Sequence, residues 1–169
     1  MEAVGKMAKA NNFIFYVDNC FASPVVQNPG DYGADLIVHS ATKFMDGQGR
    51  VMGGIVVGKQ ELIQPIKYFC RQTGPAMSPF NAWVLSKSLE TLDLRMERHC
   101  NNALHLATEL EKLKGVSNVK YPFLPSHPQY DLAKKQMKSG GALVTFEIPG
   151  GFEQVNKFTK LLQIPNKYM

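Results

Sequence analysis

Two short runs of β-forming residues, each followed by polar side chains, most strongly constrain how this chain folds. Residues 13–17 form a continuous apolar run that ends at Asp18, and residues 34–39 form a second run that leads into Ser40. Runs of this kind are typical of strands buried on both faces of a parallel sheet. The connection between them is long enough for a turn, a helix and a parallel crossover. The two runs therefore predict neighbouring parallel strands.

The rest of the chain extends this α/β pattern and then changes character. We expect a third strand at 53–58 and helices at 1–10, 59–72 and 80–114, the last as one long helix or two abutting ones. Beyond it, strands at 116–121 and 142–148 alternate with helices at 131–138 and 153–162. The fold class predicted is α/β, with a mostly parallel sheet in a large domain (1–95), followed by part of a small α+β domain (96–169).

The segment 38–44 places two hydroxyl groups and one amine just after the second predicted strand, where sites of α/β sheets lie. Lys43 is flanked by apolar residues, and burial among them would disfavour its ammonium form and make it a nucleophile toward an aldehyde. Ser40 and Thr42 are suited to bind a phosphate group. The alternative is an ordinary surface lysine after a strand.

Asp18 gives the lysine a possible counterpart at the end of the preceding strand. A carboxylate there can keep a pyridinium nitrogen protonated while Lys43 holds the aldehyde of the same ring. This pair of contacts turns pyridoxal 5'-phosphate (PLP) into an electron sink. The alternative for Asp18 is a helix cap or a structural turn carboxylate.

Several segments together resemble one enzyme family, the Cys/Met-metabolism PLP enzymes, which are cystathionine gamma-synthase-like and of fold-type I. The resemblance lies in residues 17–24, 33–43, 46–54, 73–75, 78–83, 89–92, 121–122, 126–130 and 150–151. Within the family, residues 46–54 are most similar to O-succinylhomoserine or O-acetylhomoserine sulfhydrylases. The resemblance extends to about Gln163, whereas residues 164–169 do not match the family's continuation.

The resemblance implies the large domain of a PLP-dependent transferase with the aspartate aminotransferase-like fold. Lys43 would form the internal aldimine and relay protons, Asp18 would pair with the ring nitrogen, and Ser40 and Thr42 would bind the phosphate. The implied reaction is γ-replacement of a homoserine ester by sulfide to give homocysteine, in a homo-oligomer built as a dimer of dimers. Alternatives within the family are a cystathionine gamma-synthase and a methionine gamma-lyase.

Two features depart from the family. Cys20 stands where many members have a threonine beside the ring, either altering the hydrogen bonding of the cofactor or serving as a tolerated small residue. Family members are also longer at both ends, so the chain is expected to be a fragment that lacks N-terminal and C-terminal parts. A second hypothesis therefore treats it as a catalytically inert module for folding or assembly, with exposed apolar surface.

Charge and composition argue against other classes of protein. The net charge of +5 comes from scattered lysines, without the basic block that tracks nucleic acid. No apolar run is long enough for a membrane span, and the first residues do not resemble a signal peptide. Cys20, Cys70 and Cys100 form no pair with disulfide or zinc spacing, which favours a reducing compartment and a cytoplasmic enzyme.

The remaining polar residues near the site have structural readings. Alternation along the second strand points His39 away from Ser40, so we expect a packed histidine. Arg50 and Arg71 suit either an acidic ligand or a surface role. The other histidines lack metal-ligand spacing, and no metal site is predicted. They are His99, His105 and His127.

Overall fold

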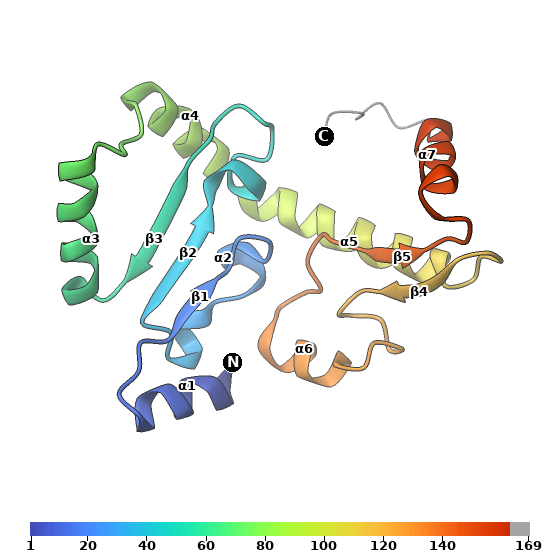
Figure 1. Ribbon diagram of the computed structural model, residues 1–169, viewed down its shortest axis with the longest axis horizontal. Coiled ribbons are helices and arrows are strands. Elements are labelled where there is room, and N and C mark those ends of the chain that lie inside the picture. The colour runs from blue at the N-terminus through green and yellow to red at the C-terminus, as the bar shows by residue number, and fades with distance from the viewer. Residues whose placement is uncertain (163–169) are drawn as a thin grey trace.

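The first part of the chain builds a three-stranded sheet in the order β1-β2-β3 (Figure 1). The computed structural model describes residues 1–162; residues 163–169, the end of the predicted second unit, lie outside that part. The strands are β1 (Tyr16–Asp18), β2 (Leu36–Ser40) and β3 (Gly54–Gly58). β1 and β2 are parallel, as predicted, with Asp18 opposite Val38. β2 and β3 are antiparallel, so the described strands form one parallel and one antiparallel pair.

The antiparallel pairing has a local cause in the segment between β2 and β3. The turn η2 (Ala41–Met45) follows β2 directly, and the chain then folds back instead of crossing over through a full helix. Gly53, just before β3, accepts the backbone N–H of Ala41 at 2.8 Å. Lys43 therefore lies in a hairpin-like reversal between β2 and β3, and the hydrogen bond between Ala41 and Gly53 joins the two ends of this reversal.

Short helical segments surround this sheet. The chain begins with α1 (Glu2–Ala10), and α2 (Ser23–Val26) and η1 (Pro29–Tyr32) make up the crossover between the parallel strands. After β3 come α3 (Gln60–Thr73) and α4 (Pro79–Leu89). Ser78 caps α4 by accepting the backbone N–H of Asn81, and Pro79 occupies the first turn, where no donor is needed.

The long helix α5 (Leu92–Leu110) joins the two lobes seen in Figure 1. The expected helical stretch 80–114 is thus two helices, separated at residues 90–91. The first half of α5 contributes Leu92, Met96 and Cys100 to the core against α2 and η2. Its second half contributes Ala103 and Ala107 to a separate core. The domain boundary predicted between residues 95 and 96 stays a prediction, and it falls within this shared helix.

The second lobe is a small α+β unit packed on the end of α5. It contains the antiparallel pair β4 (Ser117–Lys120) and β5 (Thr145–Glu147), with α6 (Tyr130–Gln136) and α7 (Gly151–Leu161). Tyr121 is its largest buried side chain, and its hydroxyl donates to the carbonyls of Cys100 and Gly141. No helix within residues 1–162 has the length and apolar character needed to cross a membrane.

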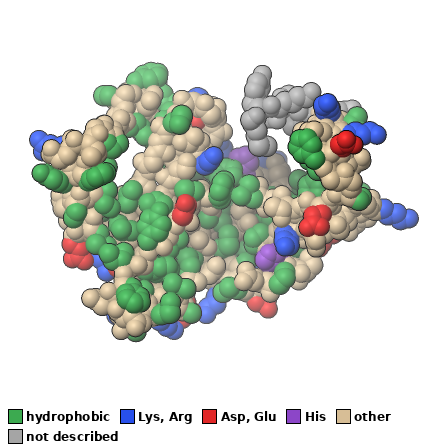
Figure 2. Space-filling model, viewed as in Figure 1, with side chains coloured by type: hydrophobic (Ala, Val, Ile, Leu, Met, Phe, Trp, Pro, Cys, Tyr) green, Lys and Arg blue, Asp and Glu red, His purple; other side chains and the backbone are tan. Residues whose placement is uncertain are grey.

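Apolar side chains are exposed over the sheet, contrary to the predicted burial of residues 13–17. Phe13 and Ile14 precede β1 and are 66% and 60% exposed, and Tyr16 within the strand is 55% exposed. Figure 2 shows apolar atoms gathered on this side of the sheet lobe. The prediction was wrong because burial of a strand's two faces depends on elements packed over the sheet, and in the described chain these side chains stay open to solvent.

Candidate functional site

The candidate site lies where β1 and β2 end. Because the two strands are parallel, their carboxyl ends meet at the same edge of the sheet. Asp18 is the last residue of β1, Ser40 is the last residue of β2, and Thr42 and Lys43 follow within η2. The structure therefore brings all four sequence-predicted residues to one edge.

Asp18 presents an exposed carboxylate at this edge. Its Oδ1 accepts the backbone N–H of Cys20 at 3.0 Å. Hydrogen bonding from Cys20, first through its side chain and then through its backbone, holds the pKa of Asp18 below its usual 3.8, with a weaker attraction from His39. The group is thus ionised at neutral pH and suited to hold a protonated ring nitrogen.

Cys20 connects the two strand ends. Its Sγ accepts the backbone N–H of Ser40 at 2.8 Å, while its backbone N–H donates to Asp18. Burial, followed by the hydrogen bond with Asp18, raises the pKa of the thiol, and the positive charge of Lys43 acts in the opposite direction. The residue that departs from the family therefore contacts site residues of both strands, a contact that the sequence did not predict.

The two hydroxyl groups differ in how far they are already engaged. Thr42 Oγ1 accepts the backbone N–H of Gly53 at 3.0 Å and lies 3.4 Å from the carbonyl oxygen of the same residue. That longer contact is the one a phosphate oxygen would replace. Within residues 1–162 the Ser40 hydroxyl has no hydrogen-bond partner, so it is the freer donor.

Lys43 lies at a kink in η2, with φ −83° and ψ −124°. Its side chain is exposed, and no carboxylate of the described chain forms an ion pair with it. The expectation that apolar neighbours bury the amine is therefore wrong for this part of the chain, because the neighbouring residues turn toward the core. Ala41 and Met45 on either side are the buried members of the turn.

His39 is packed, as alternation along β2 indicates. It is 7% exposed, and its Nδ1 is buried without a hydrogen-bond partner in the described chain. Burial lowers the pKa of the imidazole, against smaller opposite effects of the Asn19 backbone and of Asp18. A neutral, buried ring on the other side of the strand from Ser40 has no access to a ligand at the strand ends.

A buried polar network packs against η2, the turn that contains Lys43 and is called the lysine turn below. The sequence did not predict this network. Asp46 is fully buried and accepts the backbone N–H groups of residues 48, 50 and 51. Ser88 donates to Asp46 Oδ1 at 3.0 Å and accepts from Arg50 at 2.7 Å. Arg95 donates to the carbonyls of Phe44, Met45 and Ser88. Arg50, which had an acidic ligand among its possible roles, is thus bound to Asp46.

Burial, the largest influence on Asp46, would raise the pKa of its carboxyl group. Hydrogen bonds from the Arg50 backbone, Ser88, Val51 and Gln48 together outweigh it and hold the pKa below the usual 3.8. The only sequence signal for this role is an aspartate followed by Gly47 in a turn. Its partners Ser88 and Arg95 lie far along the chain, so their pairing was not visible in the sequence.

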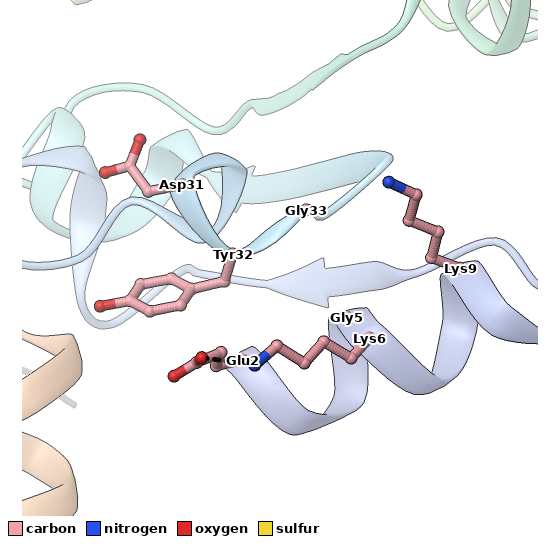
Figure 3. Close-up of a pocket in the computed structure, with 7 residues that line it drawn as sticks. All are labelled: Glu2, Gly5, Lys6, Lys9, Asp31, Tyr32 and Gly33. Carbon is pink, nitrogen blue, oxygen red and sulfur yellow. Dashed lines mark hydrogen bonds and ion pairs between the residues drawn. The ribbon is translucent and has the colours of Figure 1, made fainter.

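A hollow lies at the end of the strands opposite the candidate site (Figure 3). It is lined by Glu2, Gly5, Lys6, Lys9, Asp31, Tyr32 and Gly33. Glu2 accepts hydrogen bonds from Lys135 and Lys6, which lower its pKa to about 2, the former more strongly. Glu2 pairs with Lys6 of the same helix and with Lys135 of α6, so the hollow lies beside an ion-pair contact between α1 and α6.

No group of three or more His, Cys, Asp or Glu side chains within residues 1–162 is arranged to hold a metal ion. The groups at the strand ends instead suit an aromatic phosphate aldehyde: one amine, one ionised carboxylate and two hydroxyls. Each of these residues is exposed or half-buried. The donor set therefore fits PLP.

Comparison with known proteins agrees with this chemistry. The model of the family "Cys/Met metabolism PLP-dependent enzyme" matches residues 1–167. The chain belongs to this family. Its cofactor is PLP, and the enzymes that it resembles have the fold-type I architecture, of which the chain holds an α/β part.

Individual relatives have different activities. The chain is 47% identical to an O-succinylhomoserine sulfhydrylase of Pseudomonas aeruginosa over 92% of its length and 39% of that protein's. It is 45% identical to an L-methionine gamma-lyase of Treponema denticola over 89% of its length and 39% of that protein's. A crystal structure of cystathionine gamma synthase from Xanthomonas oryzae matches with a TM-score of 0.91 and 39% identity, over 96% of this chain and 42% of that one. The chain thus spans about two fifths of these relatives.

Proposed function

We propose that the chain supplies the cofactor-binding lysine segment of a PLP-dependent enzyme that performs γ-replacement in sulfur amino-acid metabolism. The substrates are O-succinylhomoserine or O-acetylhomoserine and sulfide, and the product is homocysteine. The parallel pairing of β1 and β2 carries this proposal, because it delivers Asp18 and Lys43 to one edge of the sheet. The sulfhydrylase of Pseudomonas aeruginosa supports the choice of substrate.

In this proposal Lys43 would hold the cofactor through its Nζ, an amine of the kind that reacts with an aldehyde. The exposed position of the side chain leaves the amine accessible. Ser40 and Thr42 hold the phosphate by donating their hydroxyl hydrogens, and Thr42 exchanges its 3.4 Å contact with Gly53 for a phosphate oxygen. Asp18, ionised at neutral pH, would accept a charge-assisted hydrogen bond from the protonated ring nitrogen.

The chemistry that bound PLP supplies is an electron sink that acidifies the α-carbon of an amino acid. As a free amine beside the bound substrate, Lys43 Nζ would take the proton from that carbon and later return one. Asp18 keeps the ring nitrogen protonated throughout. Over the whole reaction the C–O bond at the γ-carbon would break, with the ester leaving as a carboxylate, and a C–S bond to hydrosulfide would form in its place.

Two alternatives are kept because specific observations favour them. A methionine gamma-lyase or a cystathionine gamma-synthase would use the same Asp18 and Lys43, and both activities occur among the similar proteins. An inert folding or assembly module is the other, favoured by the exposed apolar side chains of the sheet lobe. We place the enzyme in the cytoplasm, on the strength of its three free cysteines, and in a homo-oligomer.

The first test asks whether the purified chain captures the cofactor at the proposed position. Mixed with PLP, it should develop the visible absorption band of lysine-bound cofactor, and borohydride reduction should fix the label on Lys43. The band should disappear in Lys43→Ala and persist in Lys67→Ala, an exposed lysine of α3 outside the site. A well-folded chain without any band supports the inert module instead.

The second test separates the enzymatic alternatives and uses the longer protein to which this segment corresponds. Homocysteine formation from O-succinylhomoserine or O-acetylhomoserine with sulfide is compared with α-ketobutyrate release from methionine. Homocysteine formation supports the proposed sulfhydrylase. Release of the keto acid alone would overturn the choice of reaction while leaving the cofactor assignment intact.

A further inference from the structure

Arg95, in the first half of α5, donates hydrogen bonds to the backbone immediately after Lys43. Its Nη1 donates to the carbonyl of Phe44 at 2.7 Å, and its Nη2 donates to the carbonyl of Met45 at 3.1 Å. Nη2 also contacts the Ser88 carbonyl at 2.9 Å, and Nε contacts Thr91 Oγ1 at 3.2 Å. All three guanidinium nitrogens are thus engaged, and two of them hold the lysine turn to the helix pair α4–α5.

The lysine turn needs such an external partner. A regular helix would hold its own backbone, but η2 is interrupted by the kink at Lys43. The carbonyls of the last residues of a helical turn have no partner within it. Those of Phe44 and Met45 are the ones that Arg95 satisfies. The only backbone bond to the Lys43 carbonyl among the described residues comes from Gly47, at 2.8 Å.

Gly47 is shaped to admit the guanidinium. A β-carbon at this position would lie 2.1 Å from Arg95 Nη1, and the residue has a φ of +69°, which favours glycine. The same glycine donates its N–H to Lys43. The close approach of Arg95 and the backbone bond to the lysine therefore depend on one residue.

The charge arrangement also indicates a specific role. Burial lowers the pKa of Arg95 most strongly, Asp46 raises it and Arg50 lowers it. Asp46 thus balances the charges of two arginines from within the core. Placing a guanidinium in partly buried surroundings costs free energy, and a planar fork that binds adjacent carbonyls gives a geometry that a lysine ammonium does not reproduce.

We propose that Arg95 is a positioning residue, which fixes the direction of the Lys43 side chain by clamping the two residues after it. This inference rests on the proposed role of Lys43 as the cofactor lysine. Arg95 itself does not contact the strand-end groups. Its effect should appear as faster and tighter capture of the cofactor aldehyde by Lys43.

The experiment compares Arg95→Met and Arg95→Lys with Arg98→Met, an exposed arginine on the same helix. Each purified chain is titrated with PLP under conditions where urea unfolding shows that it is fully folded. We expect Arg95→Met to weaken formation of the visible band at Lys43 by at least about tenfold, the equivalent of one lost charged hydrogen bond. Arg95→Lys should recover part of this loss, and Arg98→Met should match the unchanged chain.

A second readout needs no cofactor. Hydrogen exchange of the Gly47 amide, which donates to the Lys43 carbonyl, should accelerate in Arg95→Met relative to amides of β2 in the same sample. If Arg95→Met does not fold, the comparison of Arg95→Lys with the unchanged chain decides, by the same two readouts.

The outcomes distinguish this inference from the proposed function. If the unchanged chain forms no band, the cofactor role of Lys43 fails. If it forms the band and a folded Arg95 variant forms it with equal affinity and rate, with unchanged exchange at Gly47, the positioning role is overturned while the role of Lys43 stands.

Discussion

The two sides of the lysine turn differ in how fully their polar groups are satisfied. On the side of the strand ends, Asp18 and Lys43 are exposed and Ser40 is half-buried. On the opposite side, Asp46 is fully buried and its oxygens accept hydrogen bonds from five donor groups. Arg95 uses all of its nitrogens there.

This difference separates the residues proposed to bind the cofactor from the residues that fix the backbone. Groups that must bind a ligand keep free donors and acceptors, which costs little only where water reaches them. Groups that fix the backbone must be paired, because an unpaired polar group in the core is costly. Substitutions on the two sides should therefore affect different properties of the protein.

The largest expected contrast is between Asp46→Ala and Lys43→Ala. Removing Asp46 leaves Arg50, Ser88 and several backbone N–H groups without their partner, and we expect a loss of about 3–5 kcal/mol in the free energy of unfolding. Lys43→Ala should change it by less than about 0.5 kcal/mol while abolishing the cofactor band. Urea unfolding measures both, with the exposed Glu97→Ala on α5 as a control. Equal destabilisation by the two would contradict the division.

Acid should weaken the buried side. The pKa of Asp46 in the folded protein lies below its usual 3.8, so the unfolded chain binds a proton more readily. The carboxylate therefore stabilises the fold above pH 3.8, and this contribution is lost as the pH falls through 3.8 toward the folded-state pKa. Comparing unfolding at pH 7 and pH 3, the difference between the unchanged chain and Asp46→Asn should shrink at the lower pH. A constant difference would show that Asp46 stabilises without its charge.

On the exposed side, Asp18→Asn should impair the cofactor chemistry without unfolding the protein. The neutral amide does not supply the negative charge that keeps the ring nitrogen protonated, and the loss of a charged hydrogen bond corresponds to about a hundredfold in cofactor affinity or reaction rate. PLP titration and turnover of the longer enzyme measure these quantities. Asp31→Asn, at the other end of the strands, is the control. Unchanged titration and turnover in Asp18→Asn would remove the carboxylate from the site.

The smallest expected effects are those of the two hydroxyl groups. Ser40→Ala should weaken PLP binding by about tenfold, the loss of one hydrogen bond. Thr42→Val should weaken binding and also destabilise the turn slightly, because Thr42 accepts the N–H of Gly53. PLP titration measures these losses. Titration with pyridoxal, which lacks the phosphate, should show no effect of Ser40→Ala. An equal loss for both ligands would place Ser40 away from the phosphate.

The sequence predicted the strand-end site because its residues lie on local elements. Apolar runs define β1 and β2, and the polar residue that closes each run lies at the strand end, so the placement of Asp18 and Ser40 required only local information. Cys20 was visible as a departure, yet its contact with Ser40 was not expected. Burial was expected for Lys43 and Phe13, and both are exposed, because burial depends on which neighbours cover the strands.

The buried network was not visible in the sequence. Asp46 and Ser88 lie 42 positions apart, and Phe44 and Arg95 lie 51 apart. No periodicity relates these residues, and each alone resembles an ordinary polar residue of a turn or helix. The reversal of β3 also escaped prediction, because an apolar run does not specify the direction of its partner.

The sequence alone determined the α/β pattern, the family and the residues placed at the ends of the parallel strands, because strand periodicity and short motifs are local properties. Only the tertiary structure decided how the lysine turn is held and which side chains are buried. Those properties depend on α4 and α5 folding back against η2, and the hydrogen bonds that result join residues that are distant in the chain.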